Sequence, residues 1–180
     1  MLFDAELQEC GRLPALPYML RSGGLRRTYG AAVCERLIPL AESIPAIWQV
    51  SNVWLERLAP IPAIDPGEAI LFATAADLQL PVLSGDVSAL HALKRLDGFQ
   101  EVLAGRIVLL EAVLLALCRK LGAAAVREKI EPVQHVDTVM SICFSPGGHD
   151  PEQGLRSYLS DRRRGLAPLV LWGTDDKEEK

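Results

Sequence analysis

The sequence predicts a single α/β domain in which helices flank a parallel sheet, with a helix-rich C-terminal part. Three observations carry this prediction. A capped helix start and a short apolar strand follow each other at 65–84, a second helix begins directly after that strand, and the chain has the length of one compact domain. We expect the domain to span residues 1–174 and the charged tail 175–180 to be disordered, because it has nothing to bury.

The composition of the 180-residue chain is that of an ordinary folded protein, with 49% hydrophobic and 23% charged residues. Its formal net charge of −4 gives no general attraction to nucleic acid, so a polyanion site needs a local basic patch or a metal ion. The longest apolar stretch, 107–118, is shorter than the roughly 20 residues of a membrane span. No basic segment leads into an apolar one at the start, so we expect a cytoplasmic protein without a membrane segment.

The N-terminal third predicts short helices. Glycine and proline break the helical spacing over 5–20, which favours two short helical pieces. Apolar spacing predicts a helix over 29–41, limited by Pro39. The stretch 44–58 mixes apolar and polar residues and is assigned to no element, and the prolines after it indicate an extended linker.

The clearest local signals lie at 65–96. Asp65 suits an N-cap, Pro66 suits the first helical position, and Glu68 completes a capping box, so a helix is expected over Pro66–Leu78. Residues 80–84 then read as a short buried strand, and Gly85 and Asp86 turn the chain into a helix over 87–96.

The C-terminal half begins with an apolar segment at 105–111, followed by an apolar helix ending at Leu121 before a glycine C-cap. Because 107–117 is apolar on nearly every side, it suits either an enclosed core helix or one that packs against a second subunit in a homodimer. Further helices are expected around 123–129, 136–144 and 154–164.

Four cysteines lie far apart, without the close pairs of zinc or redox motifs, so we expect them reduced and mostly buried. The histidines and the arginine clusters at 21–27 and 162–164 lack the fixed spacing of a metal or phosphate motif and are interpreted as structural or solvated. The histidines are His91, His135 and His149.

Two acids could meet at one end of the predicted strand. Asp86 follows the carboxyl end of the strand, where open α/β sheets place their sites, and Glu68 opens the preceding helix. If that helix packs at the same edge, the two carboxylates converge. Convergent carboxylates bind Mg²⁺ or Mn²⁺ and leave coordinated water available for phosphodiester hydrolysis.

At Asp65-Pro-Gly-Glu and Ser84-Gly-Asp the sequence resembles the PIN-like family, over residues 65–121. The resemblance implies a metal-dependent ribonuclease in which Asp4, Glu68 and Asp86 are the catalytic acids and bind Mg²⁺ or Mn²⁺. It also implies a further acidic ligand, for which Glu35 is chosen over two competing glutamates, and RNA and a second copy as partners. The family places a clear apolar strand before its first aspartate, whereas only three apolar residues precede Asp4.

Two other hypotheses remain open. One is a PIN-like domain without catalysis that serves as a binding or assembly module, with a dispersed acidic set. The other is an unrelated α/β or mostly helical protein in which the Ser-Gly-Asp turn is coincidental. Helix capping alone accounts for Asp65, Glu68 and Asp86 at these positions.

Overall fold

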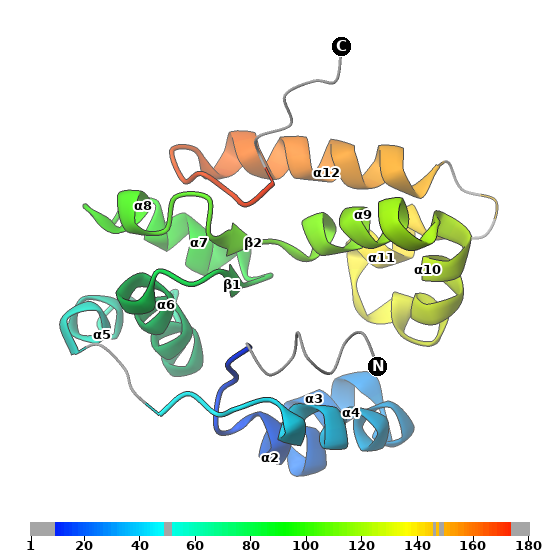
Figure 1. The fold of residues 1–180 in the computed structure, drawn as a ribbon, viewed down its shortest axis with the longest axis horizontal. Coiled ribbons are helices and arrows are strands. Elements are labelled where there is room, and N and C mark those ends of the chain that lie inside the picture. The colour runs from blue at the N-terminus through cyan, green and yellow to red at the C-terminus, as the bar shows by residue number, and fades with distance from the viewer. Residues whose placement is uncertain (1–9, 49–51, 146, 148–149, 174–180) are drawn as a thin grey trace.

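The computed structural model describes residues 10–48, 52–145, 147 and 150–173. Their fold is mostly helical, so the predicted α/β class with a parallel sheet flanked by helices is wrong (Figure 1). Within these residues the assigned strands are two, β1 (Val82–Leu83) and β2 (Ile107–Val108), which pair in parallel.

The strands are short because their neighbours in the sequence serve other elements. Pro81 has no N–H to donate to a ladder, and Asp86 already caps the next helix, so the strand expected at 80–84 shortens to two residues. On the other strand, Leu109 is the N-cap of the following helix. The apolar pattern therefore predicted the position of β1 but not β2, which lies in a segment that was not assigned to a strand.

The helices account for most of the chain (Figure 1). Those of the first half are α2 (Leu16–Ser22), α3 (Gly24–Tyr29), α4 (Ala31–Ser43), α5 (Asn52–Leu58), α6 (Pro66–Leu78) and α7 (Val87–Leu93). Those of the second half are α8 (Phe99–Val102), α9 (Leu110–Leu121), α10 (Ala123–Ile130), the short 3-10 helix η1 (Glu131–Val136), α11 (Thr138–Cys143) and α12 (Pro151–Leu166).

Several helix predictions are confirmed. Helix α6 has the predicted bounds, and α9 ends at Leu121 with Gly122 after it. Helix α7 starts where expected but ends before Lys94. The predicted tail 175–180 and the start of the chain, with Asp4, lie outside the described residues. No helix in the described part of the chain is long and apolar enough to cross a membrane.

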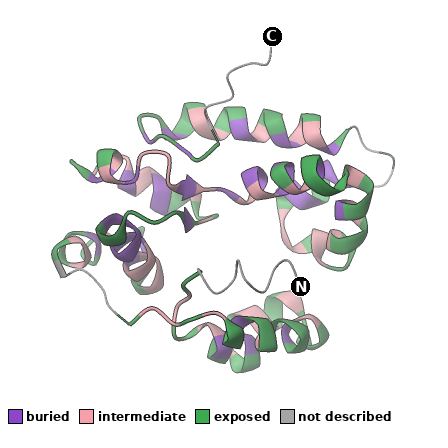
Figure 2. Ribbon diagram, in the orientation of Figure 1, coloured by how far each residue is buried: buried purple, intermediate pink, exposed green. Residues whose placement is uncertain are grey.

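The main core lies between α6, α7, α9 and α12, where Figure 2 shows the buried residues on the facing sides of the helices. Its largest fully buried side chains are aromatic, namely Phe72, Phe99 and Phe144. Helix α9 contributes Leu114 and Leu115 and packs along α12, so its interpretation as a core helix is confirmed. Of the cysteines, Cys34, Cys118 and Cys143 are free and buried, and Cys10 is exposed.

The N-terminal helices form a smaller cluster of their own around Leu20, Cys34 and Ala41. An isolated parallel bridge between Arg12 and Ala46 holds the start of this region to its end. Arg12 N donates to Pro45 O at 3.0 Å, and Ile47 N donates to Arg12 O at 2.9 Å. In Figure 1 this region lies below α6 and β1.

A third extended segment joins the small sheet on the far side of β2. Leu171 forms a parallel bridge with Ile107, supported by hydrogen bonds from Gly105 N to Val170 O at 2.7 Å and from Trp172 N to Ile107 O at 2.8 Å. Among the segments that the structure describes, β2 therefore lies in the middle and β1 at an edge.

Candidate functional site

The start of α6 carries the first two acids. The Asp65 side chain accepts from Glu68 N at 2.8 Å, and Glu68 Oε2 accepts from Asp65 N at 3.0 Å, which is a complete capping box. These bonds satisfy two backbone N–H groups that the helix itself cannot pair. Both acids therefore have a structural role in addition to any other.

Asp86 caps the next helix. Its Oδ1 accepts from Ser88 N at 2.8 Å and from Ala89 N at 3.0 Å. The residue follows β1 by three positions, so the carboxylate is held at the carboxyl end of the strand.

The charge of Asp86 acts on Glu68. Burial raises the pKa of Glu68 above its ordinary value, and the hydrogen bond with the Asp65 backbone lowers it. The negative charges of Asp86 and Asp65 raise it again, which requires the three carboxylates to lie within electrostatic reach. We call these three residues, Asp65, Glu68 and Asp86, the acidic cluster.

The remaining predicted acids do not join this cluster in the described structure. Glu35 lies on α4 and forms an ion pair with Arg26 at 3.0 Å. Asp4 lies outside the described residues. Among the residues that the structure describes, no group of three or more His, Cys, Asp and Glu side chains could hold a metal ion. The carboxylates present do not by themselves fit a Mg²⁺ or Mn²⁺ site.

The two arginine clusters are engaged within the chain. Arg21 pairs with Glu42, and Arg164 pairs with Asp161. Arg162 lies 3.4 Å from the buried carboxylate of Glu111. The interpretation of these clusters as structural or solvated agrees with these pairs. Of the histidines, His91 lies on α7 and His135 on η1, while His149 is outside the described residues.

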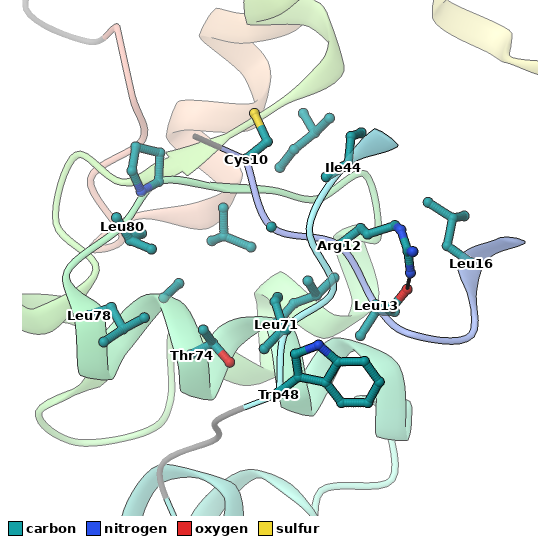
Figure 3. Close-up of a pocket in the computed structure, with 16 residues that line it drawn as sticks. Cys10, Arg12, Leu13, Leu16, Ile44, Trp48, Leu71, Thr74, Leu78 and Leu80 are labelled. Atoms are coloured by element: carbon teal, nitrogen blue, oxygen red, sulfur yellow. Dashed lines mark hydrogen bonds between the residues drawn. The ribbon is translucent and has the colours of Figure 1, made fainter. Parts of the chain in front are cut away.

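Beside the acidic cluster lies an apolar groove, of about 850 Å³, that the sequence did not indicate. Figure 3 shows that its walls come from three parts of the chain. One wall is the segment 10–13 with Leu16, a second is Ile44, Ile47 and Trp48, and the third is the α6 face followed by 80–83.

The groove has a defined direction. Leu71 lies in the middle of α6 and Leu78 at its end, while Leu80 precedes β1 and Leu83 ends it. Helix and strand run in opposite directions, so Leu71 and Leu83 mark one end of the groove and Leu78 and Leu80 the other. In Figure 3, Leu78 and Leu80 lie together, away from Leu13 and Leu71.

The acidic cluster lies at the Leu71 and Leu83 end. Glu68 is one helical turn before Leu71, and Asp86 is three residues after Leu83. Gly67 lets the N-terminal segment approach here, because a Cβ at this position would stand 2.9 Å from Leu13 Cδ1 and 3.1 Å from Asp65 Oδ1.

Large apolar side chains around the groove are unusually exposed. Trp48 is 82% exposed and Leu83 is 58% exposed, and Leu78 and Leu80 are also classed as exposed. Exposed apolar side chains gathered at one groove are typical of an interaction site, whereas isolated ones are not. The sequence contained little indication of the groove. Leu78 fits the predicted helix end, and Leu80 and Leu83 fit the predicted strand, so none of them stands out as a binding residue. Trp48 lies in the stretch that was assigned to no element.

In comparisons with family models, curated proteins and solved structures, no match to this chain was found. The resemblance to the PIN-like family therefore stays a prediction. The groove and the acidic cluster have to be interpreted from their own chemistry.

Proposed function

We propose that the protein is a binding module that takes an apolar segment of a partner protein into the groove between α6, β1 and the segment 44–48. The observation that carries the proposal is the concentration of exposed apolar side chains on the groove walls. Covering such side chains releases water at a gain of roughly 25 cal/mol per Å² of apolar surface. Aromatic side chains such as that of Trp48 commonly dominate interfaces of this kind.

The groove also has a rigid floor, which favours binding without rearrangement. Thr74 and Ala75 on α6 are buried, and the Thr74 hydroxyl donates to Ile70 O at 2.8 Å. Its polar group is thereby satisfied inside the helix. What the floor presents to a ligand is largely apolar and fixed by the core beneath it.

A peptide-display library tests this proposal directly. Random peptides selected on the full chain are retested on a Leu83→Asp variant, which puts a charge on the groove wall at an already exposed position. The matched control is Ile142→Asp on α11, where the side chain is 54% exposed and does not line the groove. We expect selected peptides to lose binding by at least about tenfold in Leu83→Asp and to keep it in Ile142→Asp. If no selected peptide loses binding in Leu83→Asp while keeping it in Ile142→Asp, the proposal is overturned.

A second candidate is the metal-dependent ribonuclease implied by the family resemblance, with Asp4, Glu68 and Asp86 as its acids. What favours it is that burial and the charges of Asp86 and Asp65 raise the pKa of Glu68. Calorimetry with Mn²⁺ tests it, comparing the native protein with a Glu68→Gln, Asp86→Asn double variant. Saturable binding that the variant loses, followed by RNA cleavage, supports this candidate, and no binding by the folded native protein refutes it.

A further inference from the structure

Within the described part of the chain, strand β1 has an unpaired edge. Its hydrogen bonds to the β2 side involve Val82 N, which donates to Arg106 O at 2.8 Å, and Ser84 N, which donates to Val108 O at 3.1 Å. Alternate residues of a parallel strand point their peptide groups to opposite edges, so the N–H and C=O of Leu83 face away from β2. Among the described residues, no segment pairs with that edge.

The unpaired edge borders the groove. Residues 80–83 line it together with the α6 face, so a chain entering the groove meets both apolar side chains and the free peptide groups of Leu83. An unpaired strand edge is a template for pairing with another extended chain. Because Pro81 has no N–H and Leu80 N donates to Ala75 O, the groups that this edge offers for pairing are the N–H and C=O of Leu83.

The charge at one end of the groove is uncompensated. The three members of the acidic cluster form no ion pair with any described residue. The partial burial of Glu68, and then the neighbouring charges of Asp86 and Asp65, disfavour the negative charge on Glu68. A cation supplied by the bound chain would relieve this repulsion, whereas an acidic chain would be rejected.

We propose that the groove binds an extended peptide segment that adds as a strand to the free edge of β1 and places a lysine or arginine against Asp65, Glu68 and Asp86. This inference rests on the proposed function and adds the conformation and charge of the partner. Alternate apolar side chains of the segment enter the groove, and its backbone bonds to Leu83. In a parallel arrangement, like that of the other two extended segments of the sheet, the basic residue lies toward the peptide's C-terminus.

The probes are two synthetic peptides of alternating valine and threonine. One carries an arginine at its C-terminus and the other carries an arginine at its N-terminus. For each, a control peptide has glutamine in place of the arginine. We expect one arginine peptide to bind about tenfold more tightly than its analogue. The preference should disappear in the Glu68→Gln, Asp86→Asn variant, which keeps side-chain shape and removes two charges.

Leu83→Pro tests the strand pairing. It removes an N–H that does not bond to β2, at an edge position where proline is tolerated. The matched control, Leu83→Ala, keeps the N–H and loses the side chain. We expect the proline variant to bind several-fold more weakly than the alanine variant. Circular dichroism and urea unfolding establish that each variant is folded.

Failure of this inference and failure of the proposed function give different results. If library peptides bind through the groove but neither arginine peptide shows the charge preference or the proline effect, the inference is overturned and the proposed function stands. If no peptide binds in a groove-dependent way, both are overturned. A concentration-dependent dimer in ultracentrifugation that Leu83→Asp abolishes would put a second copy in the groove and overturn the inference.

Discussion

Asp65, Glu68 and Asp86 each serve a helix end and also contribute to one negatively charged surface. Their backbone hydrogen bonds hold the carboxylates in place, so the acidic cluster is built before any ligand arrives. The proposed binding role and the stability of the helix ends therefore involve the same side chains, and substitutions separate the two only when they preserve the cap.

Asp65→Ala is expected to destabilise the protein by about 1 kcal/mol, because it leaves the Glu68 N–H without its acceptor at the start of α6. Asp65→Asn keeps an N-cap oxygen and should stay within a few tenths of a kcal/mol of the native protein. Urea unfolding measures both. Equal losses in the two variants would mean that the cap does not stabilise α6.

Glu68→Gln is expected to change the pH dependence of stability. Because the folded-state pKa of Glu68 lies above its ordinary value of 4.5, its contribution is fully present below that value and is lost as pH rises through the folded-state pKa. The variant, which can still complete the capping box, should match the native protein near pH 3 and be more stable at pH 7.

The gain should stay below about 1 kcal/mol, because solvent screens a partly exposed group. Unfolding at the two pH values measures the difference. A variant that is less stable than the native protein at pH 7 would contradict the raised pKa.

At the scale of elements, prediction succeeded where the signal was local. Helix α6 was predicted with its bounds because its cap, proline and glutamate all lie within four residues. The prediction of the sheet failed because strand pairing depends on residues that are distant in the sequence. Val82 of β1 pairs with Ile107, 25 residues later, and Ile107 pairs with Leu171, a further 64 residues along the chain. No local pattern shows whether two-residue strands will extend.

The candidate site also combines features with a local sequence signal and features that depend on distant residues. The convergence of Glu68 and Asp86 was a prediction that depended on the helix packing at the end of the strand, and the charge of Asp86 does act on Glu68. The groove could not be predicted, since Trp48, Leu71 and Leu83 come from different elements and their exposure is decided by packing. Glu35 was chosen without a local signal and pairs with Arg26 instead, and the prediction for Asp4 lies outside the described residues.

Helices α9 and α12 are joined by a buried charge. Glu111 is 6% exposed, and Arg162 on α12 supplies its partner at 3.4 Å. Arg162→Met is expected to destabilise the protein by roughly 1–3 kcal/mol, because it leaves a buried carboxylate without its cation. The Glu111→Met, Arg162→Met double variant should recover most of that loss. Additive losses in urea unfolding would show that the pair is not coupled.

At the scale of the whole molecule, apolar exposure and negative charge meet at one place. The net charge of −4 disfavours RNA in general, and the arginine clusters are largely occupied by ion pairs within the chain. An apolar chain that carries a positive charge is therefore a better match to this surface than a polyanion. The main core beneath α6 makes the groove a stable platform for such a chain.

Amide hydrogen exchange on the full chain, with and without a groove-dependent library peptide, tests this binding surface most directly. Binding is expected to slow exchange at Leu83 and along 71–78, and to leave α11 and α12 unchanged, because the peptide covers only the groove walls. Protection confined to α11 and α12, or absent at Leu83 and α6 under saturating peptide, would contradict the assignment of the groove as the binding site.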